Sequence, residues 1–123
     1  MPYPVYKLIH FLGIFVLLTT LTASSMHVLR GGTRADNPAR RAIGITHGVA
    51  AFLILLGGFG MLARLGMVDA GLPLWIYLKL AIWLLLGAAL FVVYRGSRVA
   101  GPLMVAVPLL ATLAAAIAYY KPS

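Results

Sequence analysis

The 123-residue chain has no cysteine and only two acidic residues, Asp36 and Asp69. The absence of cysteine excludes disulfides, thiolate metal sites and cysteine nucleophiles. Both acids fall in polar connections, so none of the long apolar segments contains a carboxylate. This distribution argues against carboxylate proton relays and di-metal carboxylate centres, and it leaves no acid to orient the histidine of a serine triad.

Apolar residues fill most of the sequence instead. Hydrophobic residues make up 63% of the chain and charged residues 10%, and the mean hydropathy is +1.01. Such a composition is far from that of soluble domains. Four continuous apolar runs each approach the ~20 residues that a helix needs to cross a bilayer. They cover residues 5–25, 42–62, 74–94 and 101–120.

The sequence therefore predicts an all-α integral membrane protein in which residues 1–123 form one domain. Helices are favoured over strands because the runs do not alternate, and because a helix satisfies its own backbone hydrogen bonds in lipid. Short connections favour an up-and-down four-helix bundle, with the first and third helices diagonally opposite. We expect the first helix to be retained rather than cleaved as a signal peptide.

Basic residues give the chain a net charge of +8, but they lie in the connections rather than on a soluble face, so we expect no nucleic-acid partner. Arginines concentrate in the first and third connections, where they also suit contact with lipid headgroups. By the positive-inside rule these connections face the cytoplasm, and both termini face the outer, periplasmic side of a bacterial inner membrane. The arginines are Arg30, Arg34, Arg40, Arg41, Arg95 and Arg98; Lys7, Arg64 and Lys121 lie on the opposite side.

Small residues on the second helix predict a packing face, because helices in lipid associate where small residues let the backbones approach. Gly44 and Gly48 form a GxxxG pair, and Ala51 and Gly58 continue it at helical spacing. The fourth helix has a similar stripe of alanines, and Pro108 is expected to kink it. The alanines are Ala111, Ala114, Ala115 and Ala118.

Two ionisable residues are predicted to share a layer near the outer boundary. His10 and Lys79 each lie about six residues into parallel helices, or roughly 8 Å below the surface at 1.5 Å per residue. Trp75 and Trp83 flank Lys79 at helical spacing and could offer cation–π contact. A planar or elongated cofactor would fit between the two helices. The alternative is that Lys79 snorkels to the headgroups and His10 is an interfacial histidine.

A second candidate site lies on the opposite side of the membrane. His47 opens the second span from that side, and His27 lies just past the end of the first span. Neutral imidazoles are good haem or metal ligands, so the first hairpin could bring the two rings together. The alternative for His27 is a solvated side chain at the interface. His10 and His47 are too far apart in depth to ligate one iron.

The chain resembles the SirB family of small membrane proteins over nearly its whole length. The resemblance rests on YKLIHFLGIFVLL with His10, RRAIGITHGVAAFLILLGGFGML with His47, PLWIYLKLAIWLLLG with Lys79, and the ending AIAYYKP. A more distant resemblance is to HemJ-type protoporphyrinogen oxidases, which bind haem b. It implies that His10 and Lys79 are the functional pair. The chain departs from that family at the end of the first helix, where it has TTLTASSMHVLRGG.

These observations leave three functions open. The first is a protein that binds haem b, a porphyrin or a quinone between helices one and three and acts in membrane electron transfer or tetrapyrrole chemistry. The second is a structural or accessory membrane subunit that forms a homo-oligomer or joins a larger complex. The third is a small transporter or channel, which the lack of buried acids disfavours.

Overall fold

The computed structural model describes residues 2–66 and 71–120, and within them the chain is all-helical. Its four helices are α1 (Tyr3–Leu29), α2 (Arg40–Arg64), α3 (Leu74–Val93) and α4 (Ser97–Tyr120). Each is long and apolar enough to cross a membrane, which confirms the four predicted helices. Helix α4 begins at Ser97, earlier than its apolar run predicted. Asp69 and Lys121 lie outside the described residues.

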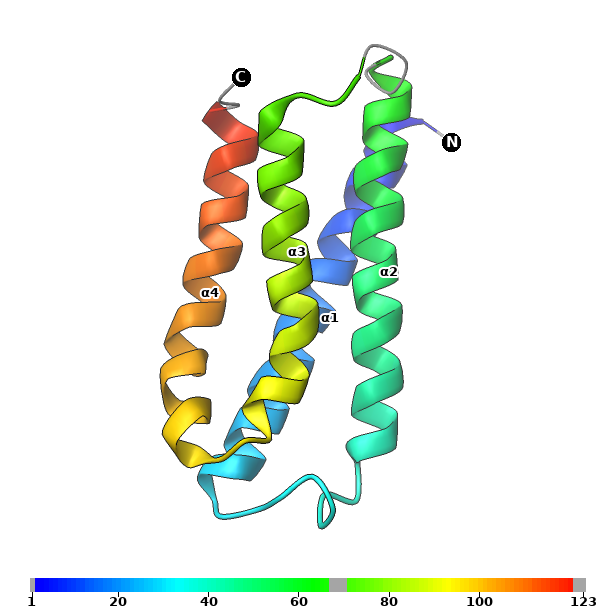
Figure 1. Cartoon of the computed structure of the whole chain (residues 1–123). Coiled ribbons are helices and arrows are strands. Elements are labelled where there is room, and N and C mark those ends of the chain that lie inside the picture. Colours follow the sequence, from blue (N-terminus) through cyan, green and yellow to red (C-terminus); the bar gives the residue numbers. More distant parts are fainter. Residues whose placement is uncertain (1, 67–70, 121–123) are drawn as a thin grey trace.

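Successive helices run in opposite directions, as an up-and-down bundle requires (Figure 1). The start of α1 and the end of α4 both lie at the top of Figure 1, which we call the upper end. The α1–α2 and α3–α4 connections lie at the lower end. Helix α4 bends in its lower part (Figure 1), and two prolines, Pro102 and Pro108, lie inside the helix. Each proline lacks the N–H that would complete the helical ladder.

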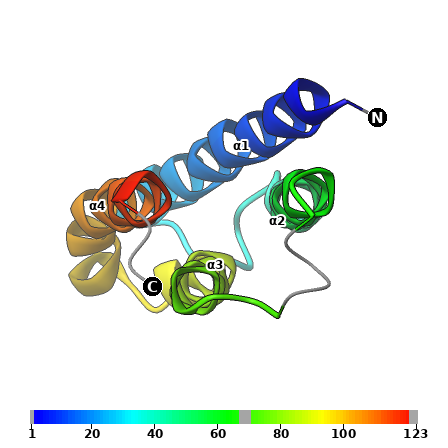
Figure 2. The same cartoon turned by 90° about the horizontal axis from the view of Figure 1, so that it is seen from above.

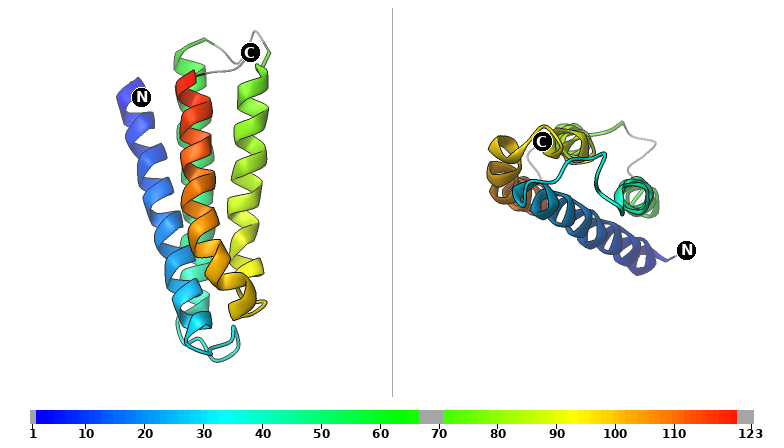
Figure 3. Two further views of the ribbon diagram at one scale, coloured as in Figure 1. Left: turned by 90° about the vertical axis from the view of Figure 1, so that its left-hand side faces the viewer. Right: turned by 90° about the horizontal axis from the view of Figure 1, so that it is seen from below.

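Helix α1 crosses the bundle obliquely. Seen from above, it passes from the side of α2 at its start to the region beneath α4 at its end (Figure 2). The views from the side and from below agree (Figure 3). Helix α1 packs most extensively on α2 and also contacts α4 and α3. Helices α2 and α3 meet in a small buried cluster of Leu62, Trp75 and Ile76, whereas no described residues join α2 to α4. The pair that stays apart is therefore α2 and α4, and not α1 and α3 as expected.

Two glycines let α1 and α2 approach backbone to backbone. A Cβ atom at Gly57 would lie 2.6 Å from the backbone N of His10 and 2.7 Å from the backbone O of Tyr6. A Cβ at Gly13 would lie 2.8 Å from the carbonyl oxygen of Ala50. Such distances are shorter than van der Waals contact, so these positions accept only glycine without displacement of a helix.

The GxxxG pair predicted on α2, Gly44 and Gly48, does not pack within the described part of the chain. A Cβ at Gly44 or Gly48 would meet nothing within 4 Å, and one at Gly58 would meet only the His10 ring, at 3.6 Å. Gly48 and Gly57 are nine residues apart, about two and a half helical turns, so they point in opposite directions. Ala51, by contrast, is half-buried and packs against the main apolar core.

The main apolar core occupies the middle and lower part of the bundle and draws residues from all four helices. Its buried members are Leu17, Leu21, Ala50, Ile82, Leu86, Ala89, Leu90 and Val107. The lower end is also fastened by a polar contact, because the buried Asn37 side chain donates a hydrogen bond to the Tyr94 hydroxyl at 3.0 Å. The connection between α3 and α4 turns at Gly96, whose φ of +137° suits glycine.

Gly57→Ala should separate α1 from α2, because the new methyl group would meet backbone atoms that cannot rotate away. We expect a loss of about 1–3 kcal/mol in the free energy of unfolding, the usual cost of overpacking. The matched control is Gly48→Ala on the opposite face of the same helix, which should be neutral or should stabilise by up to ~1 kcal/mol. Reversible unfolding in mixed micelles measures both. Equal stabilities of the two variants would contradict the close contact.

Candidate functional site

A cavity of about 490 Å³ lies above the core, toward the upper end, and all four helices line it. Leu17, Ile82 and Leu86 belong to both the core and the lining, so the top of the core is the floor of the cavity. Volumes of ~300–1,000 Å³ with mostly apolar linings and a few polar groups are typical of small-molecule and cofactor sites. The polar lining residues comprise His10, Lys7, Lys79, Tyr3, Tyr119, Trp75 and Trp83.

His10 is held in a defined orientation on the α1 wall of the cavity. The side chain is 8% exposed, and its Nδ1 lies 2.7 Å from the carbonyl oxygen of Ile54 on α2. A carbonyl can only accept, so Nδ1–H donates and Nε2 of the neutral ring carries the lone pair. Within the described residues Nε2 has no hydrogen-bond partner. Metal-ligating histidines commonly have this arrangement, with the distal N–H donated to a carbonyl.

Lys79 faces the same cavity from α3 and is half-buried. No hydrogen bond or ion pair joins its ammonium group to any described residue. Trp83, one turn below, lines the cavity and donates its indole N–H to the carbonyl oxygen of Ala51 at 2.9 Å, which links α3 to α2. The predicted cation–π contact of Lys79 is not formed. In the described part of the chain Lys7 makes such a contact instead, over Phe11 at 5.9 Å.

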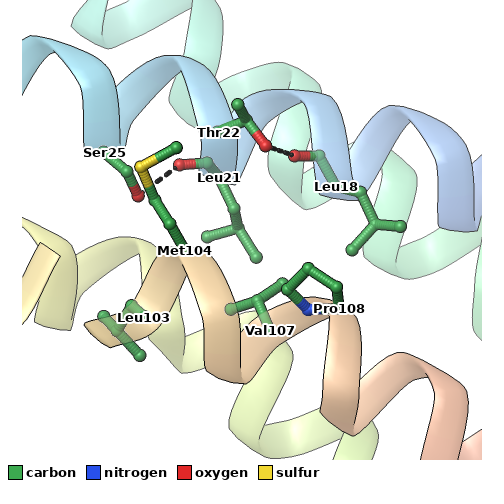
Figure 4. Close-up of a pocket in the computed structure, with 8 residues that line it drawn as sticks. All are labelled: Leu18, Leu21, Thr22, Ser25, Leu103, Met104, Val107 and Pro108. Atoms are coloured by element: carbon green, nitrogen blue, oxygen red, sulfur yellow. Dashed lines mark hydrogen bonds between the residues drawn. The ribbon is translucent and has the colours of Figure 1, made fainter. Parts of the chain in front are cut away.

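The alanines of α4 form one wall of the cavity, and Ala114 also packs against the apolar core. Ala111, Ala114, Ala115 and Ala118 all line it. Helices α1 and α4 meet lower down, where Figure 4 shows Leu18, Leu21, Thr22 and Ser25 of α1 facing Leu103, Met104, Val107 and Pro108 of α4. The pocket between them is only about 50 Å³. Thr22 and Ser25 donate to carbonyls of their own helix there, so they need no ligand.

His47 ties three helices together. Its Nε2 lies 3.0 Å from the carbonyl oxygen of Gly87 on α3, and its Nδ1 lies 2.8 Å from the Thr20 hydroxyl on α1. The Thr20 hydroxyl also lies within reach of its own helix, 2.7 Å from the Leu17 carbonyl oxygen. Both ring nitrogens of His47 are therefore occupied, and a metal could bind only if one of these hydrogen bonds broke.

His27 has different partners at the lower end. Its Nε2 lies 2.8 Å from both the carbonyl oxygen of Thr33 and a carboxylate oxygen of Asp36. The backbone N–H of Thr33 also donates to Asp36, at 2.7 Å. Both hydrogen bonds lower the pKa of the Asp36 carboxyl below its usual value, and the bond from Thr33 has the larger effect. The inner haem or metal site remains a prediction, but these hydrogen bonds do not support it.

Of the residues predicted from sequence, the structure places His10, Lys79, Trp75 and Trp83 around one cavity. His27 and His47 do not share a site, because each ring is hydrogen-bonded to different residues. Sequence reasoning did not assign Lys7 and Thr20 to a site. Lys7 could have been assigned to the site because it lies one helical turn before His10. No sequence pattern indicates that Thr20 contacts His47. Across residues 2–66 and 71–120, no three histidines or acids gather as a metal site.

Comparisons with protein-family models, with curated protein sequences and with solved structures found no match to this chain. The resemblances to the SirB family and to HemJ-type oxidases therefore remain predictions from the motifs.

His47→Ala should destabilise the bundle, because it removes hydrogen bonds from α2 to both α1 and α3. Interhelical hydrogen bonds in membrane proteins average ≈ 0.6 kcal/mol each, and unpaired buried groups cost ≈ 1–3 kcal/mol. We expect a total loss of about 1–3 kcal/mol by unfolding in mixed micelles. Thr46→Ala, at the exposed neighbouring position, should change the stability by less than ~0.5 kcal/mol. An unchanged His47→Ala variant would show that the histidine does not hold the helices together.

Proposed function

We propose that the protein is a multi-pass protein of a bacterial inner membrane, with both termini on the outer side. Four helices of sufficient length and apolarity support the spans. The six arginines in and beside the lower-end connections support the orientation by the positive-inside rule. Aromatic residues at the upper end support the span boundaries as an interfacial belt. They are Tyr3, Tyr6, Trp75, Tyr77, Tyr119 and Tyr120.

Within this bundle, we propose that the upper cavity binds a haem, a porphyrin or a quinone. The observation that carries the proposal is His10 in the wall of an apolar cavity, with Nδ1–H donated to Ile54 and Nε2 unpartnered among the described residues. The donor set fits such a group: Nε2 suits an iron or a hydrogen-bond donor, and the Lys79 ammonium suits a carboxylate or carbonyl. Apolar side chains and Trp83 would contact the body of the ring.

A cofactor bound there would supply electron-transfer chemistry, and we propose a role in membrane electron transfer or tetrapyrrole metabolism. The chain's own contribution is to hold the imidazole in one tautomer, to place a cation beside it and to exclude water with an apolar wall. The motifs shared with HemJ-type oxidases point to the same two residues, His10 and Lys79. An enzymatic activity is left open.

An accessory membrane subunit without its own chemistry is the second candidate function. It is favoured by one observation: Gly44 and Gly48 face open space on a surface of α2 that also exposes Val49 and Phe52. Such a surface allows another helix to approach closely. For this function, Gly44→Leu with Gly48→Leu should disrupt a defined oligomer or complex while the monomer's stability is retained.

The visible spectrum of the protein purified in mild detergent, before and after dithionite, tests the cofactor proposal. With haem we expect a Soret band and reduced α and β bands. A metal-free porphyrin or a quinone would be found by solvent extraction and mass spectrometry. His10→Ala and Lys79→Met should each lower the cofactor content per protein at least tenfold, because they remove the two polar groups that hold it.

His27→Ala and Arg98→Met are the matched controls, since each removes the same kind of side chain outside the cavity. Both should keep the cofactor content of the native chain. Equal content in His10→Ala, Lys79→Met and the native protein would refute the upper site. Loss of haem in His47→Ala, but not in His10→Ala, would establish the inner site instead.

Filling the cavity provides a test that leaves its polar residues intact. Ala111→Trp adds a large side chain to the half-buried alanine wall and should reduce cofactor content severalfold, because the space is taken. Ala88→Trp, at an exposed position of α3, is the control and should have no effect. Full cofactor content in a folded Ala111→Trp variant would mean that the ligand lies elsewhere.

A further inference from the structure

Two lysines from different helices line the upper cavity, Lys7 on α1 and Lys79 on α3. Lys7 precedes His10 by one helical turn, so the two share a face of α1. Lys79 is half-buried, whereas Lys7 is exposed and lies over the Phe11 ring. The cavity therefore has two positive charges.

The chain offers these lysines no negative charge in the part that the structure describes. Of its two acids, Asp36 is bonded to His27 and Thr33 at the lower end, and Asp69 lies outside the described residues. Neither lysine forms an ion pair with any described group. A lysine inside a membrane span is costly unless something pairs with it, so an intramembrane ammonium without a partner indicates a ligand.

The cavity is polar on one side and apolar on the other. The floor of the cavity is the apolar top of the core, formed in part by Leu17 and Leu86. Trp83 forms part of the wall and connects α3 to α2 through its hydrogen bond to Ala51. Tyr3 and Tyr119, from the start of α1 and the end of α4, also line it, which places the polar groups toward the upper end. An occupant would therefore place its apolar body over the core and its polar groups toward the lysines.

We infer that the ligand is an amphiphile with two acidic groups, one paired with Lys79 and the other with Lys7. This inference rests on the proposed function and narrows it, because a neutral quinone leaves both ammonium groups unpaired. Two sources share the required chemistry: a dicarboxylic tetrapyrrole and a membrane lipid with two phosphates. His10, which lines the same cavity one helical turn from Lys7, then meets the body of the ligand.

Binding of a dicarboxylic porphyrin and of its uncharged dimethyl ester tests the inference. The full chain is placed in nanodiscs of neutral phosphatidylcholine, and protoporphyrin IX or its dimethyl ester is titrated against tryptophan fluorescence, with empty nanodiscs as the blank. We expect the diacid to bind at least tenfold more tightly than the diester. Lys7→Met and Lys79→Met should each weaken diacid binding by about tenfold, the usual scale for a hydrogen bond to a charged group.

The diester serves as the folding control, because its affinity should be the same in the native chain and in both lysine variants. Arg98→Met, at the lower end, should leave both affinities unchanged. Displacement of the diacid by diphosphatidylglycerol from the native chain, and weaker lipid binding to Lys7→Met and Lys79→Met, would support the two-acid ligand and identify lipid as its source.

Equal affinities of diacid and diester in the native chain would overturn the two-acid inference while leaving the cofactor proposal intact. An unchanged diacid affinity in Lys7→Met would overturn it in the same way, because one anchor would then suffice. If neither porphyrin form binds to the native chain, the proposed tetrapyrrole site is wrong. If diphosphatidylglycerol also fails to bind, the two-acid inference falls with it.

Discussion

The rest of the structure depends on the direct contact between the backbones of α1 and α2. At Gly57 this contact leaves no room for even one methyl group beside His10 and Tyr6. It brings the upper half of α1 to the side of α2, and α1 meets α4 lower down, from residue 18 to the end of the helix. The same approach brings Nδ1 of His10 within 2.7 Å of the Ile54 carbonyl. One steric feature thus opens the cavity and also fixes the imidazole that lines it.

Buried polar groups divide into those that hold the bundle and those that face the cavity. His47 and Trp83 donate to carbonyls of neighbouring helices, at Gly87 and Ala51. They join α2 to α3, in addition to the buried apolar contact of Leu62 with Trp75 and Ile76. His10, by contrast, uses one ring nitrogen for structure and presents the other to the cavity. Counting hydrogen bonds at each ring nitrogen therefore separates a structural histidine from a candidate ligand more clearly than depth in the membrane does.

The sequence was sufficient to predict the four helices and to bring His10 and Lys79 to one site, but not the faces that pack. Apolar run length and helical rise depend only on chain order, so the four helices and the common layer of His10 and Lys79 followed from simple arithmetic. Packing faces depend on which of several glycines meets a neighbour. Gly44 and Gly48 have the familiar spacing, yet Gly57 makes the contact. Hydrogen bonds such as Thr20 to His47 join distant segments, and no local pattern reveals them.

The alanine wall of α4 has a consequence for the thermodynamics of binding. An alanine side chain has no χ rotamers, so a wall built from Ala111, Ala114, Ala115 and Ala118 loses no side-chain conformational entropy when a molecule settles against it. Such a wall also has no long side chain that could fold inward and occupy the space. This part of the cavity is preorganised: its shape before binding is its shape afterwards, and the affinity it contributes is not reduced by an ordering cost.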